Sequence, residues 1–141
     1  MEPRRILIVA NQTAGGEHLK AVIERRLAEG PCLFTLLVPA SPPADHGTWT
    51  EGQMRSLAEQ RMHDAVEGLR RTGADVRGVV GDPRPIHAIT DVLVEQPHDE
   101  IVVSTFPVGI SRWLKQDLPH RVERTFRLPV THVVAEPALK T

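Results

Sequence analysis

The chain has 141 residues, of which 40% are hydrophobic and 25% are charged, and these values are typical of a single soluble globular domain over residues 1–141. Its 17 Lys and Arg residues almost balance its 18 Asp and Glu residues, and the net charge of -1 argues against a general nucleic-acid-binding protein. No segment approaches the roughly 20 apolar residues of a membrane span. The single cysteine, Cys32, excludes an internal disulfide and favours the cytoplasm.

The first half of the chain predicts two strands and two helices. Residues 6–10 and 32–38 are near-continuous apolar runs, as expected of strands that are buried on both faces. Apolar residues at helical spacing predict a helix after each strand. For the second and longer helix, Thr48 and Glu51 fit a capping box, and Gly73 is a plausible stop.

The second half continues the alternation. Residues 74–81 predict a weaker third strand, and Asp82 fits the N-cap of the helix that follows it. Residues 100–104 and 129–135 predict the fourth and fifth strands. Between them we expect two short helices, because Pro119 disfavours helical geometry in the residue before it and starts a new segment.

Alternating strands and helices of this kind favour an α/β fold. We expect a three-layer sandwich, in which a Rossmann-like, five-stranded parallel sheet carries helices on both faces. In such a sheet, ligands bind beyond the carboxyl ends of the strands, at the point where the strand order reverses. The loops that begin at Asn11 and Ser104 flank this point if the first and fourth strands are neighbours.

The segment after the fourth strand has side chains suited to an anion. Ser104, Thr105 and Ser111 offer hydroxyl groups, and Gly109 allows close approach of the backbone. Ser111 fits the N-cap of a following helix, whose first amides and dipole favour an anion, and Arg112 adds positive charge. A second interpretation stays open, in which Ser111 simply caps its helix and Arg112 lies in solvent.

Three stretches of the sequence resemble the universal stress protein family. They are "RRILIVANQT" (4–13), "VVGDPRPIHAITDVLVEQPHDEIVVS" (79–104) and "LPVTHVVAE" (128–136). The resemblance implies the strand order 3-2-1-4-5. It also implies a homodimer in which the last strand pairs with its counterpart, with Val130, His132 and Val134 at the interface.

The sequence departs from the pattern of ATP-binding members of that family. The acidic residue after the first strand is Asn11 here, and the first two glycines of the motif after the fourth strand fall on Ser104 and Pro107. Proline lacks the amide donor that a phosphate needs, and Asp117, near the last glycine position, would repel a phosphate. These departures argue against ordinary ATP binding in the family's pose.

Signatures of catalysis and of metal binding are missing from the sequence. It has no phosphate-binding loop motif, no nucleophile elbow and no pair of histidines at helical spacing. No pair of titratable groups has an evident reason for perturbed pKa values. We therefore expect a protein that is not an enzyme and holds no metal or resident cofactor, with ATP and AMP as the nucleotides to test.

The leading hypothesis is a non-enzymatic, cytoplasmic stress-type protein that binds a small anionic or nucleotide-like ligand. Seven polar or glycine positions and an apolar wall form the predicted site: Asn11, Thr13, Ser104, Thr105, Gly109, Ser111 and Arg112, with Val38 and Pro39 as the wall. Two alternatives stay open. One is a nucleotide phosphoanhydride hydrolase of the adenine-nucleotide α-hydrolase group, and the other is a dimeric interaction module without a ligand.

Overall fold

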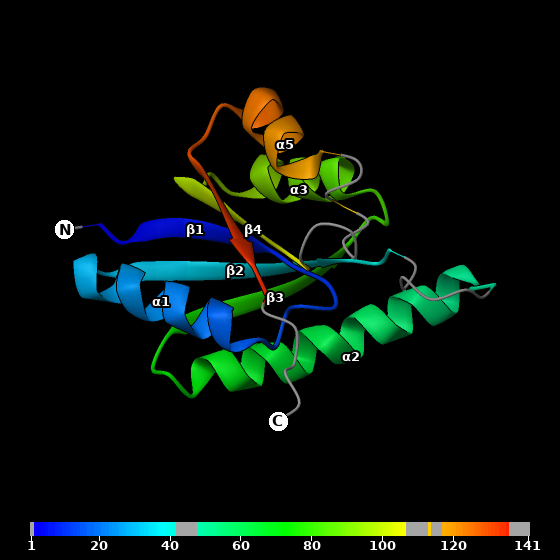
Figure 1. Cartoon of the computed structure of the whole chain (residues 1–141), viewed down its shortest axis with the longest axis horizontal. Helices are drawn as coiled ribbons and strands as arrows, with labels where there is room; N and C mark the ends of the chain where they lie inside the picture. The colour runs from blue at the N-terminus through cyan, green and yellow to red at the C-terminus, as the bar shows by residue number, and fades with distance from the viewer. Residues whose placement is uncertain (1, 42–47, 107–112, 114–116, 136–141) are drawn as a thin grey trace.

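A five-stranded parallel sheet lies between two layers of helices (Figure 1). The computed structural model describes residues 2–41, 48–106, 113 and 117–135. In chain order the elements are β1 (Arg4–Val9), α1 (Glu17–Glu29), β2 (Cys32–Pro39), α2 (Glu51–Arg70), β3 (Asp75–Gly81), α3 (Pro85–Glu95), β4 (Glu100–Thr105), α5 (Leu118–Phe126) and β5 (Val130–Val134). The strand order is β3-β2-β1-β4-β5, with every pairing parallel, which confirms the predicted Rossmann-like α/β sandwich.

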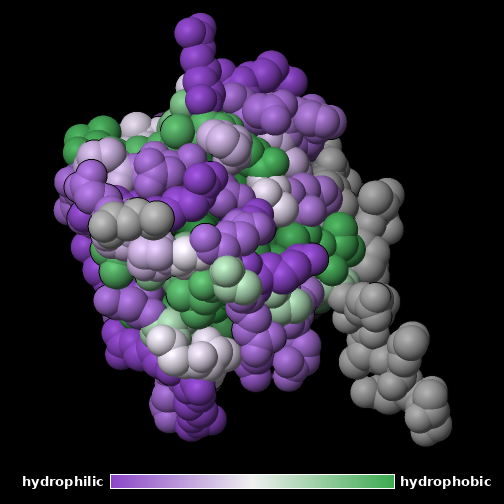
Figure 2. Space-filling model, turned by 90° about the vertical axis from the view of Figure 1, so that its left-hand side faces the viewer, coloured by the Kyte–Doolittle hydropathy of each residue, from purple (hydrophilic) through white to green (hydrophobic). Residues whose placement is uncertain are grey.

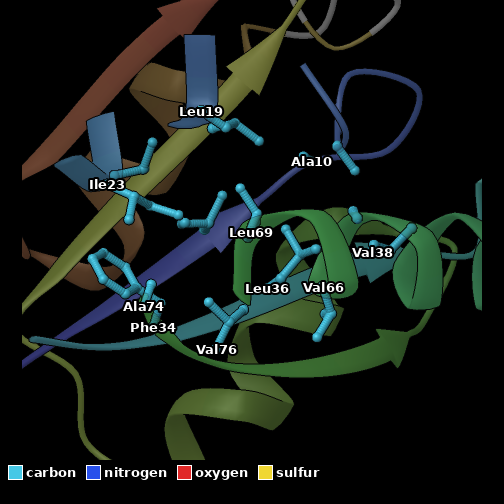
Figure 3. Packing of buried hydrophobic residues seen from close by; sticks show 14 of the residues in the cluster. Ala10, Leu19, Ile23, Phe34, Leu36, Val38, Val66, Leu69, Ala74 and Val76 are labelled. Carbon is cyan, nitrogen blue, oxygen red and sulfur yellow. The ribbon is translucent and has the colours of Figure 1, made fainter. Parts of the chain in front are cut away.

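The central strand β1 is buried on both faces of the sheet. Ile6 and Ile8 belong to a core cluster with residues of α1 and α2, whereas Leu7 and Val9 belong to a second cluster with residues of α3 and α5. Figure 1 shows these helix pairs on opposite sides of the sheet, and Figure 3 shows part of the first cluster. Because both faces are covered, the strand reads as a continuous apolar run.

Helix α2 begins two residues later than the sequence predicts. Its capping box is formed by Thr50 and Gln53: the Thr50 hydroxyl accepts from the Gln53 N–H at 3.1 Å, and the Gln53 side chain accepts from the Thr50 N–H at 2.9 Å. The predicted box of Thr48 and Glu51 is therefore wrong. The reason is that two threonines stand two positions apart, each followed three residues later by a side chain that can complete a box.

Helix α3 also begins later than predicted. Its N-cap is Arg84, and Pro85 opens the first turn. The Asp82 carboxylate accepts from the Arg84 N–H at 2.8 Å and from its guanidinium at 3.0 Å, so the prediction of Asp82 as N-cap is wrong. A helix does begin next to Pro119, as expected, but α5 starts at Leu118, so the prediction of a non-helical residue before the proline is wrong. Proline is tolerated in the first turn because its missing N–H has no partner there. None of the helices in the described ranges is long and apolar enough to cross a bilayer.

A buried carboxylate at the amino end of β4 connects this strand with α1, β1 and β5. Glu100, at the start of β4, is 3% exposed, accepts from Arg26 at 3.1 and 2.7 Å, and accepts from the Thr131 hydroxyl at 3.0 Å. Arg4 lies 3.4 Å away. Burial favours the neutral form of this carboxyl group, but the hydrogen bonds from Arg26 and Thr131 outweigh it and lower the pKa of Glu100. The surface at this end of the sheet mixes hydrophilic residues with separate hydrophobic patches (Figure 2).

Candidate functional site

Three hydrogen-bonded side chains lie where β1 and β4 end. Val9 pairs with Val103, so the residues that follow these two positions lie side by side. Ser104 Oγ lies 2.6 Å from Thr13 Oγ1 and 2.6 Å from His18 Nε2. Ser104 and Thr13 are 1% and 6% exposed, and two partners satisfy a hydroxyl group that can donate once and accept twice.

The imidazole of His18 is the accessible member of this cluster. It stands near the start of α1 and is partly exposed. A Cβ at Gly16 would overlap its ring, so the glycine leaves the space in which the imidazole lies. Burial lowers the pKa of His18 below 6.5, and the ring is therefore neutral at pH 7. A neutral ring has one nitrogen that accepts, which suits a hydrogen bond from Ser104.

Thr105 belongs to the other face of the sheet. Successive side chains of a strand point to opposite faces, so Thr105 does not share the cluster of Ser104. Its hydroxyl lies 2.7 Å from Nε2 of His132 in β5. Burial lowers the pKa of His132, with a further contribution from His120. The pair links β4 to β5 at the carboxyl end of the sheet.

A second set of polar contacts joins the ends of β1 and β2. Asn11 Nδ2 donates to the Pro39 carbonyl oxygen at 3.0 Å, and Arg61 Nη1 of α2 donates to Asn11 Oδ1 at 2.6 Å. A carbonyl only accepts and a guanidinium only donates, so these two partners determine which way the amide points. Asn11 and Arg61 are both partly exposed, which leaves them within reach of a ligand.

The predicted site residues do not form a single cluster. Asn11 and Pro39 contact each other, and Thr13 contacts Ser104, whereas Thr105 faces the other side of the sheet. Val38 is fully buried in the core cluster beside α1 and α2 (Figure 3), so its side chain packs beneath this edge. The remaining predicted contacts lie outside the described residues: Gly109, Ser111 and Arg112.

Sequence reasoning did not single out His18 or Arg61 as site residues. Arg61 follows the buried Ala58 by three residues and precedes the buried Ala65 by four, so it stands on the inner stripe of α2. A charged or polar residue on an apolar stripe is a signal for a buried or functional contact. His18 precedes the buried Val22 by four residues and carries the same signal on α1.

This edge of the sheet offers hydroxyl, amide, imidazole and guanidinium groups. Such donors suit a polar or anionic ligand. Among the described residues, no three His, Cys, Asp or Glu side chains are grouped in a way that would hold a metal ion. Ser104 and neutral His18 have the spacing of a nucleophile and its base, but a hydroxyl in a residue that is 1% exposed is closed to a substrate.

Comparisons with known proteins identify the fold. No family model and no curated protein matches the sequence. A universal stress protein in complex with cAMP superimposes with a TM-score of 0.60 at 15% identity, covering 94% of this chain and 97% of that one. The universal stress protein from Archaeoglobus fulgidus in complex with dAMP gives 0.59 at 16% identity, covering 94% and 98%. A protein of this family from Burkholderia pseudomallei gives 0.62 at 15% identity, covering 93% and 96%.

The chain therefore has the universal stress protein fold over nearly its whole length, and the resemblance in the sequence is confirmed at the level of the fold.

Proposed function

We propose that this protein binds a small anionic or nucleotide-like ligand at the carboxyl ends of β1 and β4 and performs no chemistry on it. The strand order reverses between these two strands, and in open parallel sheets ligands bind at such a point. The observation that carries the proposal is the cluster of Thr13, His18 and Ser104 at this point. Structural neighbours in complex with cAMP and dAMP support a nucleotide-like ligand.

Thermal unfolding with a ligand panel tests the proposal. The panel contains AMP, cAMP, dAMP, ATP, adenosine and inorganic phosphate. Ligand at about 100 times its Kd stabilises a protein by about 2.7 kcal/mol, so a binding nucleotide raises the melting temperature measurably. We expect Arg112→Ala to abolish the shift and Arg25→Ala, at an exposed position of α1, to retain it. An unchanged melting temperature of the unaltered protein with every compound would contradict the proposal.

A hydrolase is the second candidate function. The distance of 2.6 Å between Ser104 Oγ and His18 Nε2 is the observation that favours it, and the burial of Ser104 argues against it. This candidate requires ATP turnover in the presence of magnesium that is lost in Ser104→Ala. If the purified protein releases no phosphate from ATP, the hydrolase hypothesis is wrong.

We also propose that the protein works in the cytoplasm as a homodimer. Strand β5 lies at the edge of the sheet, and Val134 on it is 42% exposed, which suits pairing with a second β5 through Val130, His132 and Val134. Cys32 is a free, buried thiol, and burial raises its pKa, so it needs no oxidising compartment and is a poor nucleophile.

A further inference from the structure

A hollow of about 300 Å³ lies at the amino end of the sheet, opposite the end that carries the candidate site. Strands β1, β2 and β3 and the segment between α3 and β4 line it, and its polar lining residues are Arg5, Thr35, Asp75, Arg77, Gln96 and His98. Pockets that bind small molecules begin at roughly 300 Å³, so this hollow suits a small ligand. The proposed function does not use it.

Two arginines of this lining stand on the same face of the sheet. Arg5 precedes Leu7 by two positions in β1, and Arg77 precedes Val79 by two positions in β3. Side chains two positions apart in a strand share a face, and Leu7 and Val79 both pack in the core cluster beside α3. Thr35 lies between them, because it pairs with Leu7 on one side and with Arg77 on the other. Both arginines therefore lie where the apolar cluster beside α3 ends.

Within the part of the chain that the structure describes, no ion pair and no side-chain hydrogen bond neutralises these two guanidiniums. Arg5 donates to the Asp99 carboxylate with its backbone N–H and not with its side chain. Arg4 and Arg26, at the same end of the sheet, show the contrast, because both lie beside the buried carboxylate of Glu100. The guanidiniums in the hollow therefore keep their donors for a ligand.

The buried imidazole of His98 lies near both arginines. Burial is the largest cause that lowers the pKa of His98, and the charges of Arg77 and Arg5 lower it further. Both positive charges therefore act on the same ring. Its two nitrogens have protein oxygens at 2.9 and 3.0 Å, so the neutral ring is already satisfied and supplies no charge of its own. The positive charge of the hollow comes from the arginines.

The lining is positively charged overall. Among the described residues that line the hollow, Asp75 is the single acid, against the two arginines. It stands at an exposed position, two residues before Arg77. The planar fork of a guanidinium matches the oxygens of a phosphate or a carboxylate, and a hydrogen bond between charged partners is roughly twice as strong as a neutral one. The excess of positive charge therefore favours an anion.

We propose that this hollow binds a small oxyanion, held by the guanidiniums of Arg5 and Arg77. Phosphate and carboxylate groups share the chemistry that the two arginines recognise. The inference goes beyond the proposed function, because it assigns a second site at the other end of the sheet. Neither site depends on the other.

Nuclear magnetic resonance of the histidine side chains in the full chain tests the proposal. Inorganic phosphate and succinate are titrated separately, with sodium chloride keeping the ionic strength constant so that screening does not change. His98→Gln and His18→Gln assign the two imidazole signals. A bound anion favours the charged form of a nearby imidazole, so we expect a saturating shift of the His98 signal and a higher pKa of His98. Binding at the candidate site would move the His18 signal instead.

Variants of the lining identify the groups that hold the anion. Loss of one charge-assisted contact weakens binding by roughly tenfold, so Arg5→Gln and Arg77→Gln should each weaken it to that extent. Asp75→Asn should strengthen binding, because it removes a carboxylate that repels the anion. Arg55→Gln, at an exposed position of α2 on the other side of the sheet, is the matched control and should bind as the unaltered protein does.

Each outcome decides for or against the site. A His98 shift with phosphate alone identifies a phosphate site, and a shift with succinate shows that carboxylates bind too. If neither anion moves the His98 signal, the proposal is wrong, whatever happens at His18, and the proposed function still stands. It is also wrong if either arginine variant binds with unchanged affinity. If Arg5→Gln does not fold by circular dichroism, Arg77→Gln, at an exposed position of the edge strand β3, decides by the same criterion.

Discussion

Three histidines in the described part of the chain make hydrogen bonds that suit their neutral form. His18 and His132 each contact a hydroxyl group at the carboxyl end of β4. His98 lies at the other end of the sheet, where Nδ1 is 2.9 Å from the Gln96 carbonyl oxygen and Nε2 is 3.0 Å from Thr35 Oγ1. Because a carbonyl oxygen only accepts, Nδ1 carries the hydrogen and Nε2 accepts from Thr35.

These histidines make the stability depend on pH. Burial lowers the pKa of all three below 6.5, and at His98 the nearby charges of Arg77 and Arg5 act in the same direction, while the Gln96 carbonyl and Asp99 oppose it. A lowered pKa means that the unfolded chain binds more protons than the folded one as the pH falls below 6.5. The stabilisation that these neutral histidines provide is therefore fully present above pH 6.5. Below that pH the free energy of unfolding decreases.

Urea unfolding above and below pH 6.5 measures this effect. We expect His98→Gln to reduce the loss of stability on acidification, because one proton-binding group of the unfolded chain is removed. His63→Gln, at an exposed position of α2, is the matched control. If the free energy of unfolding fell equally with pH in His98→Gln and in the unaltered protein, His98 would not be a source of the pH dependence.

The N-cap of helix α2 makes a measurable contribution to stability. Thr50 and Gln53 satisfy each other's backbone amides, whereas Thr48 lies outside the helix. Loss of an N-cap side chain costs about 1 kcal/mol. We expect Thr50→Ala to lower the free energy of unfolding by about that amount and Thr48→Ala to have a much smaller effect. Denaturant titration of both variants measures the difference, and an equal loss would contradict the observed cap.

The sequence predicts the elements better than it predicts the contacts between them. Buried strands are visible because β1 and β2 are covered on both faces and read as apolar runs. The starts of α2 and α3 both lie two residues beyond the predicted ones. For α2 a second capping threonine stands two positions on, and for α3 the Asp82 carboxylate accepts from the Arg84 N–H in the turn before the helix. The strand order was predicted through the resemblance to a known family.

The contacts at the candidate site lie beyond what periodicity can predict. His18 and Ser104 are 86 residues apart, and Asn11 and Arg61 are 50 apart. Periodicity indicates which side of an element a residue occupies, but not which residue of another element it meets. The sequence predicts Ser104 and Thr105 as contacts of one ligand, yet neighbouring positions in a strand face opposite sides of the sheet.

The proposed homodimer makes a prediction about the whole molecule. If β5 pairs with β5 of a second copy, a charge on its exposed side chain should break the dimer. We expect Val134→Lys to give monomers, because a lysine at a paired edge repels its counterpart and must lose its hydration. Val94→Lys on α3 is the control, since Val94 is 80% exposed and lies away from β5. Analytical ultracentrifugation measures the mass, and dimers of Val134→Lys would refute this interface.

The buried Glu100 has a consequence for the order of assembly during synthesis. Arg26 Nη2 and Thr131 Oγ1, which both bind Glu100, are 3.3 Å apart in space and 105 residues apart in sequence. Strand β5 covers one edge of β4, so until β5 has been synthesised the backbone groups on that edge of β4 have no strand to pair with. If β5 paired with β4 in a register shifted by one residue, the Thr131 side chain would point to the opposite face of the sheet, away from the Glu100 carboxylate. The pair of Arg26 and Glu100 therefore favours the observed register of β5, because this register places Thr131 beside both side chains.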